Sequence, residues 1–253
     1  MAVPGRRRGR RAGSIAGVNI SAGLESETGE VSDTALHGAK LVIAVDGPSG
    51  AGKSSASRGA ATALGLRYLD TGATYRALTW WLLEHGVDTE DPEAVAAHAR
   101  EPRIEVGTDP AAPWTRVDGT DVTEAIRTRE VTGAVSAVAR VPQVRVHLIA
   151  LQRDIIASSA GIVAEGRDIG TVVAPEAPVK VFLTADGAAR AVRRAAQVNW
   201  SPDTTRADQD RRDSMDAANS GKAANAIEID STALSLDEVV ARIVGLAQRV
   251  RNG

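Results

Sequence analysis

One segment of the sequence has residue types and spacing that could hold a polyphosphate. Gly47 to Ser54 reads GPSGAGKS, which fits the phosphate-binding pattern G-x-x-x-x-G-K-[S/T]. Its glycines allow successive backbone N–H groups to converge on phosphate oxygens at the positive end of the following helix. We expect Lys53 to reach the β- and γ-phosphates and the Ser54 hydroxyl to bind Mg²⁺. The expected ATP contacts are Gly47, Pro48, Ser49, Gly50, Ala51, Gly52, Lys53, Ser54 and Ser55.

A triphosphate site does not by itself name a reaction, because GTPases, transport ATPases and small-molecule kinases share it. The chain has neither the Asn-Lys-x-Asp motif that reads guanine nor the Leu-Ser-Gly-Gly-Gln signature of transporter ATPases. The remaining class is a kinase of a small acceptor.

Arginines follow two predicted strands and could hold such an acceptor. Arg76 ends the stretch DTGATYR that begins at Asp70, and Arg167 lies in EGRDIG, which begins at Glu165. If the acceptor is a phosphate monoester, two anions must be brought together, and the planar guanidinium group suits this task. Doubly wound α/β folds bind ligands at the carboxyl ends of their parallel strands. We therefore expect both arginines to face one crevice. Taken singly, each arginine is more often a solvated surface charge than a ligand, because such residues are mostly exposed.

Apolar runs alternate with helical patterns from Lys40 onward, which favours an α/β fold with a five-stranded parallel sheet flanked by helices. Trp114 to Thr123 alternates around Asp118-Gly119, which predicts a hairpin within an inserted subdomain. Trp80 and Trp81 are expected in the core of that subdomain. We predict strands at 41–45, 66–69, 161–164, 179–183 and 226–229, and helices at 53–64, 74–85, 91–99, 134–157, 187–198, 206–217 and 236–250.

The composition restricts the possible partners. With 30 basic and 32 acidic residues the formal charge is -2, so no overall field draws the chain to nucleic acid or to an anionic membrane. The absence of cysteine excludes disulfides and thiolate zinc sites. We therefore expect a cytoplasmic monomer that binds small molecules and neither nucleic acid nor membrane.

The first 38 residues differ from the rest of the chain. They combine an arginine cluster near the start with a stretch that has neither helical nor strand periodicity. Residues 12–24 are too polar and too rich in glycine for the apolar region of a signal peptide. We interpret residues 1–38 as a disordered N-terminal extension.

Four motifs, in their order and spacing, resemble those of bacterial cytidylate kinases. They are GPSGAGKS, LDTGATYR, IRTREVTGAVSAVARVPQVR at 126–145 and AEGRDIGTVVAPEAPVKVFL at 164–183. The resemblance extends over almost the whole chain from Lys40 and implies transfer of a phosphoryl group from Mg-ATP to CMP or dCMP. It also implies a P-loop kinase fold, with a core at 40–72 and 146–253, a monophosphate-binding insertion at about 73–145 and a short lid at about 194–212.

The resemblance implies roles for individual residues. Arg76 and Arg167 would hold the CMP phosphate, with Thr71 beside it. Asp168, with Ser136 and Arg145, would meet the cytosine, where a carboxylate can accept from the 4-amino group that uracil lacks. A salt bridge between Asp168 and Arg167 is the structural alternative for this carboxylate. The residues implied at the ribose are Arg212 and Asp216, those implied in catalysis are Lys53, Arg76, Arg167, Arg194 and Arg212, and the further lid candidates are Arg190, Arg193 and Arg211.

Two positions leave alternatives open. Glu165 is expected near magnesium, as an outer or water-bridged ligand, and is equally readable as a solvated acid. Asn219 occupies a position where the family usually has another arginine, and Ser220-Gly221-Lys222 replaces its usual Ser-Pro-Leu segment. Because one cation is missing, a kinase of UMP or of another small phosphate, and a non-catalytic nucleotide-binding protein, remain alternatives.

Overall fold

This computed structural model describes residues 40–198, 211, 213–217 and 220–252, without the side chains of 194–198. The predicted extension at 1–38 lies outside the described residues, as do Arg212, Asn219 and most of the predicted lid at about 194–212. Arg194 belongs to the helix α6 (Gly187–Val198), and its side chain is not described.

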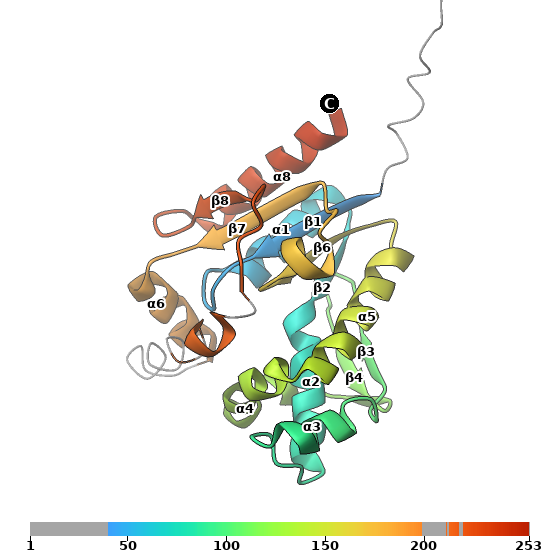
Figure 1. Cartoon of the computed structure of the whole chain (residues 1–253). Coiled ribbons are helices and arrows are strands. Elements are labelled where there is room, and N and C mark those ends of the chain that lie inside the picture. The colour runs from blue at the N-terminus through green and yellow to red at the C-terminus, as the bar shows by residue number, and fades with distance from the viewer. Residues whose placement is uncertain (1–39, 199–210, 212, 218–219, 253) are drawn as a thin grey trace, which may run out of the picture. The chain divides into compact units, whose positions relative to one another are not determined.

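The main sheet contains five strands in the order β2-β6-β1-β7-β8 (Figure 1). Every neighbouring pair is parallel, so the predicted five-stranded parallel sheet is confirmed. The strands are β1 (Leu41–Asp46), β2 (Arg67–Asp70), β6 (Gly161–Gly166), β7 (Val179–Thr184) and β8 (Ile227–Asp230).

Both faces of this sheet are covered. Leu41, Ile43 and Val45 of β1 pack on one face against α1 (Lys53–Leu64) and α8 (Leu236–Asn252). Ala44 points to the opposite face, whose core includes residues of α5 (Pro142–Ser158) and of the π-helix η2 (Ile169–Val173). Successive side chains of β1 therefore alternate between the apolar cores on the two faces of the sheet, as expected for a central parallel strand.

The segment between β2 and β6 builds its own core. Trp81 is buried there, as predicted, and Trp80 packs against the same cluster. The predicted hairpin is confirmed, with its turn at Asp118 and Gly119, both at positive φ. The predicted domain boundaries, including the insertion at about 73–145, stay a prediction. The elements are α2 (Thr71–Glu84), α3 (Pro92–His98), β3 (Ile104–Val106), β4 (Thr115–Val117), β5 (Thr120–Asp121), the 3₁₀ helix η1 (Ala125–Arg127) and α4 (Arg129–Arg140).

The helix predicted at 134–157 is wrong as a single element. The structure has α4 and α5 in its place, and their axes differ by 99°. Val141 adopts an extended conformation between them, with φ -70° and ψ 120°. Pro142 has no N–H to donate and disfavours a helical residue before it, so it ends α4 and begins α5.

Other helix boundaries follow from their caps. α1 has the predicted bounds, and Gly65 caps it in the left-handed conformation. α2 begins three residues earlier than predicted, because the Asp70 carboxylate accepts the N–H of Ala73 at 3.1 Å and caps the helix at Thr71. In the helix predicted at 206–217, the described residues Arg211 and 213–216 are helical.

Among the residues that the structure describes, no single helix has the length and apolar composition needed to cross a membrane. The bent pair of α4 and α5 passes that test by length and composition when taken together.

Gly47, directly after β1, lies so close to the backbone of β7 that a side chain has no room there. Its φ is 148°, and an added Cβ would lie 2.0 Å from the carbonyl oxygen of Leu183. We expect Gly47→Ala to lower the free energy of unfolding by about 3 kcal/mol or more, because no flexible side chain can move aside. In the control Gly187→Ala, the added Cβ would meet nothing within 4 Å, and we expect a change within about 0.5 kcal/mol. Urea titration measures both, and equal effects would contradict this account of the loop.

Candidate functional site

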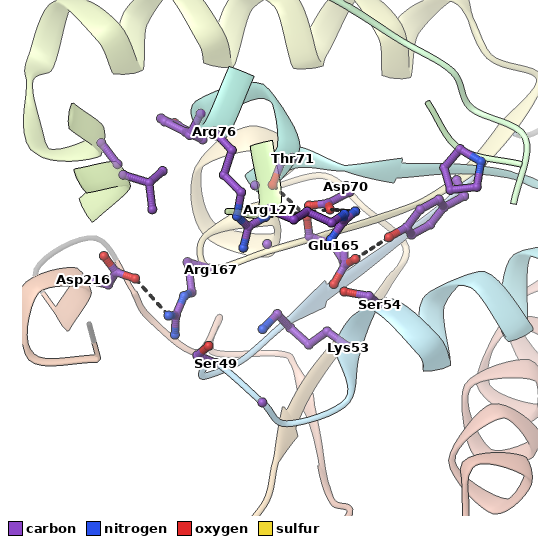
Figure 2. Close-up of a pocket in the computed structure, with 18 of the residues that line it drawn as sticks. Ser49, Lys53, Ser54, Asp70, Thr71, Arg76, Arg127, Glu165, Arg167 and Asp216 are labelled. Atoms are coloured by element: carbon purple, nitrogen blue, oxygen red, sulfur yellow. Dashed lines mark hydrogen bonds and ion pairs between the residues drawn. The ribbon is translucent and has the colours of Figure 1, made fainter. Parts of the chain in front are cut away.

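Three adjacent strands end at the same edge of the sheet and bring the predicted site together. Asp46 at the end of β1 is in register with Gly166 of β6, and Asp70 at the end of β2 with Glu165. The P-loop after β1, the start of α2 after β2 and the loop after β6 line one cleft of about 980 Å³ (Figure 2). A cleft of this volume is at the upper end of the range usual for small-molecule sites.

Most of the predicted site residues line this cleft. Gly47 and Pro48 are not part of the lining, and Ala51 is fully buried behind the loop. Arg212 lies outside the described residues, and the side chain of Arg194 is not described. The predicted residues that line the cleft are Ser49, Gly50, Gly52, Lys53, Ser54, Ser55, Thr71, Arg76, Ser136, Arg145, Glu165, Arg167, Asp168 and Asp216.

The loop from Gly47 to Gly52 has the conformation that an anion site requires. Gly50 and Gly52 have φ values of 79° and 92°, which lie in the left-handed region where a side chain is disfavoured. Gly52 caps the N-terminus of α1, so the positive end of that helix opens into the cleft. Lys53 donates to the carbonyl of Pro48 at 2.8 Å and so lies across its own loop. This arrangement can receive a polyphosphate.

Asp70 lies between two arginines on the opposite side of the cleft. Its Oδ2 is 3.9 Å from Nη1 of Arg76 and 3.6 Å from Nη2 of Arg127. Both are loose ion pairs, and both arginines line the cleft (Figure 2). Arg127 was not among the predicted site residues, although it is the first arginine of the quoted motif that begins at Ile126.

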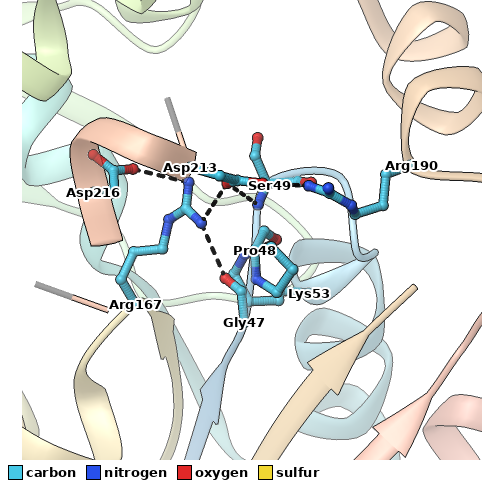
Figure 3. Close-up of polar contacts among 8 residues, drawn as sticks. All are labelled: Gly47, Pro48, Ser49, Lys53, Arg167, Arg190, Asp213 and Asp216. Atoms are coloured by element: carbon cyan, nitrogen blue, oxygen red, sulfur yellow. Dashed lines mark hydrogen bonds and ion pairs between the residues drawn. The ribbon is translucent and has the colours of Figure 1, made fainter. Parts of the chain in front are cut away.

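Arg167 lies between the P-loop and the helical turn at 213–216 (Figure 3). Its Nη1 is 3.0 Å from Oδ1 of Asp213, and its Nη2 is 2.9 Å from Oδ2 of Asp216. Nη1 also donates to the carbonyl of Gly47 at 3.5 Å. The phosphate arginine predicted from sequence is therefore held by two carboxylates and beside the P-loop.

Asp168 forms its ion pair with Arg145, so the alternative of a salt bridge with Arg167 is wrong. Asp168 and Arg145 are two of the three residues predicted to meet the base. The third, Ser136, is 1% exposed and lines the same cleft. Its Oγ has no hydrogen-bond partner among the residues that the structure describes. A buried hydroxyl without a partner is costly, so this atom is suited to a bound ligand.

Glu165 is buried at the floor of the cleft and contacts Tyr68, whose hydroxyl donates to Oε1. Burial raises the pKa of Glu165, and the nearby Asp70 carboxylate raises it further, while Lys53 and hydrogen bonds from Tyr68 and Ser54 act in the opposite direction. The solvated-acid alternative for Glu165 is wrong, because the side chain is only 3% exposed. Burial, with the charge of Arg167, lowers the pKa of Lys53.

Three of the predicted lid arginines form hydrogen bonds with other parts of the chain. Arg193 donates to Oγ of Ser231 at 2.9 Å and to its carbonyl at 2.7 Å, so it ties α6 to the end of β8. Arg211 donates to the carbonyl of Gly133 at 3.3 Å. Arg190 contacts the P-loop, where it donates to the carbonyl of Ser49 at 3.0 Å.

Asp46 is a further residue of the site that sequence reasoning missed. It is 3% exposed, and its carboxylate accepts the N–H groups of Ile169 and Gly170 at 2.7 and 2.8 Å. These bonds fix the loop that carries Arg167 and Asp168 to the strand that carries the P-loop. An acid directly before the glycine of a P-loop was the only sequence signal.

Comparison with known proteins gives a consistent result. The family model described as Cytidylate kinase matches residues 43–249. A protein named Cytidylate kinase from Streptomyces coelicolor is 51% identical over 219 residues, which cover 84% of this chain and 95% of that protein. Proteins of the same name from Nocardia farcinica and Corynebacterium diphtheriae are 48% and 44% identical, over 84% and 83% of this chain and 96% and 95% of their own lengths.

Asp46 should make the stability of the protein depend on pH. Burial raises the pKa of Asp46 from 3.8 to about 6, against the effect of its two backbone hydrogen bonds. Between these values the folded chain keeps a proton that the unfolded chain has released, so the contribution of Asp46 to stability falls as pH rises. We expect the free energy of unfolding of the wild type to decrease relative to that of Asp46→Asn, by on the order of 2 kcal/mol between about pH 4 and pH 7.

Urea titrations at several pH values measure this difference. The matched control is Asp154→Asn, which removes an exposed carboxylate of α5. Its curve should run parallel to that of the wild type. A parallel curve for Asp46→Asn as well would contradict the raised pKa.

Proposed function

This chain belongs to the cytidylate kinase family, and we propose that its cleft transfers the γ-phosphoryl group of ATP to CMP or dCMP, with release of ADP and CDP or dCDP. The observation that supports this most is the shared lining of one cleft by the P-loop, Arg76 and Arg167. Two anion sites in one cleft fit a donor and an acceptor that both carry phosphate.

The P-loop is the proposed donor site. Backbone N–H groups from Gly50 to Ser55 would surround the β- and γ-phosphates, and Lys53 would turn from the carbonyl of Pro48 to the phosphate oxygens. A phosphate oxygen is a stronger partner for an ammonium group than a carbonyl, because the bond is assisted by charge on both sides.

Ser54 and Glu165 are the proposed protein contacts of Mg²⁺. The described residues contain no cluster of three His, Asp or Glu side chains that could hold a metal by themselves. A hydroxyl with one nearby carboxylate fits Mg²⁺, which keeps several waters and binds largely through substrate phosphates. When bound, the ion would neutralise charge on the transferred phosphoryl group. Ser54 would be the direct ligand, and Glu165 would orient a bound water.

Arg76 and Arg167 are the proposed ligands of the acceptor phosphate, with Thr71 beside them. Thr71 is buried, and its hydroxyl donates to the backbone carbonyl of Glu165 at 2.7 Å. This contact supports a role in shaping the site. Arg76 is only loosely paired with Asp70, so little has to be broken before it binds a phosphate.

The base of the acceptor would lie between the insertion and the loop after β6, and the ribose beside the helical turn at 213–216. The Asp168 carboxylate would accept from the 4-amino group of cytosine, and Arg145 would donate to the ring nitrogen or the carbonyl oxygen. The Oγ of Ser136, which has no partner among the described residues, would gain one from the acceptor. We assign Asp216 and Arg212 to the ribose.

The chemistry needs no protein nucleophile. A phosphate oxygen of CMP attacks the γ-phosphorus while the bond to the β-γ bridging oxygen breaks, and ADP leaves. The protein would align the two phosphates and neutralise their charge with Lys53, Arg76 and Arg167, and with the lid arginines Arg194 and Arg212. A monomeric state and a cytoplasmic location, where both nucleotides are supplied, belong to the same proposal.

An acceptor panel tests the proposed reaction. ADP release from Mg-ATP is measured with CMP, dCMP, UMP, AMP and shikimate as acceptors. We expect CMP and dCMP to lead, with kcat/KM at least about 100-fold above that for UMP, because uracil would leave buried polar groups unpaired. UMP in first place would favour the alternative acceptor, and ATP binding without any turnover would favour a non-catalytic protein.

Asp168→Asn tests the assignment of the base. An amide can turn its NH₂ group toward the uracil oxygen, so we expect the ratio of kcat/KM for CMP to that for UMP to fall at least about tenfold. The matched control Asp154→Asn should keep the ratio of the wild type. An unchanged ratio in Asp168→Asn would remove Asp168 from base recognition.

A further inference from the structure

Asp213 joins three parts of the chain that are far apart in sequence. Its Oδ1 accepts the backbone N–H of Ser49 at 3.2 Å and lies 3.0 Å from Nη1 of Arg167. Its Oδ2 forms an ion pair with Nη1 of Arg190 (Figure 3). The P-loop, the loop after β6 and the helix α6 therefore meet at one carboxylate.

Arg190 closes the same network on the P-loop side. Its Nη1 also donates to the carbonyl of Ser49 at 3.0 Å. Ser49 is thus held through its N–H by Asp213 and through its carbonyl by Arg190. Because the backbone N–H and carbonyl of Ser49 are both hydrogen-bonded in this network, the position of the P-loop backbone depends on the position of Asp213.

The charges of the network favour an ionised Asp213. Burial opposes ionisation, but the charge of Arg167 and hydrogen bonds from Arg167, Arg190 and Ser49 outweigh it and lower the pKa of Asp213. Two guanidinium groups this close would otherwise repel each other, and a carboxylate between them removes that cost.

Asp213 is not part of the cleft lining. Ser49, Arg167 and Asp216 line the cleft, whereas Asp213 and Arg190 are absent from its lining in the described part of the chain. Asp213 therefore contacts two lining residues, Arg167 and Ser49, without being part of the lining itself.

From this geometry we propose that Asp213 is a positioning residue, which orients Arg167 and Arg190 against the P-loop for phosphoryl transfer. The proposal rests on the proposed function, since it concerns the same cleft. Asp213 touches neither substrate and acts through the two arginines and the amide of Ser49. Its removal should affect the alignment of the phosphates more than the binding of the nucleotides.

The first test compares Asp213→Asn, Asp213→Glu and the control Asp154→Asn. Asparagine keeps the shape and removes the charge, so we expect kcat for CMP to fall about 10- to 100-fold, as misplaced catalytic groups do. The KM values for CMP and ATP should change less than about threefold. Asp213→Glu keeps the charge and should recover at least part of kcat, whereas a merely structural residue would give no such recovery. The control should match the wild type.

Two outcomes of this test overturn the proposal. One is a kcat within about twofold of the wild type in Asp213→Asn, since then no alignment depends on the charge. The other is lower KM values with kcat kept or raised, which would mean that Asp213 competes with the substrates for the arginines. If Asp213→Asn does not fold, Asp213→Glu carries the test, and full loss of kcat with normal folding overturns the proposal.

A double-mutant cycle with Arg190→Gln gives the second test. If Asp213 acts through Arg190, the double variant should be no more than about threefold worse than the poorer single variant, because both remove the same interaction. Losses in kcat that multiply would show independent roles and overturn the proposal. Failure of the proposed function is distinguishable, because it appears as inactivity of the wild type toward CMP in the acceptor panel.

Discussion

The parallel register of β1, β6 and β2 is the constraint on which the rest of the structure depends. Hydrogen bonding between these strands sets Asp46 level with Gly166 and Asp70 level with Glu165. This register brings together the P-loop, the start of α2 with Arg76 and the loop with Arg167, which are separated in sequence by α1 or by the whole insertion. The carboxylate of Asp46 then fixes the finer spacing, since it binds one loop from the end of the neighbouring strand.

The cleft balances its positive charges with carboxylates from its own chain. Asp70 lies near Arg76, Asp168 pairs with Arg145, and Arg167 has two acidic partners. Such pairing lowers the repulsion between neighbouring cations in the folded protein. In the proposed reaction, a phosphate would bind best where it replaces a loosely paired carboxylate or meets an arginine that another contact already orients. Asp70 fits the first case, and Asp213 the second.

Local sequence signals predicted the fold well where a single residue decides the conformation. Gly65 ended α1 as predicted, and Asp118-Gly119 gave the hairpin. The break at Pro142 was missed because apolar periodicity continues through it, although proline chemistry was the available signal. Contacts between distant segments, such as that of Asp213 with Ser49, depend on tertiary packing and leave no local pattern. The same holds for Asp46, whose partners follow it by more than a hundred residues.

The central claim is that one cleft holds both phosphates end to end. A cytidine and an adenosine joined through a pentaphosphate chain would span both sites at once. In steady-state kinetics with the wild-type protein, this compound should inhibit competitively against ATP and also against CMP, and bind more tightly than either nucleotide, since one molecule gains both sets of contacts. Competition against only one of the two nucleotides would contradict a single shared cleft.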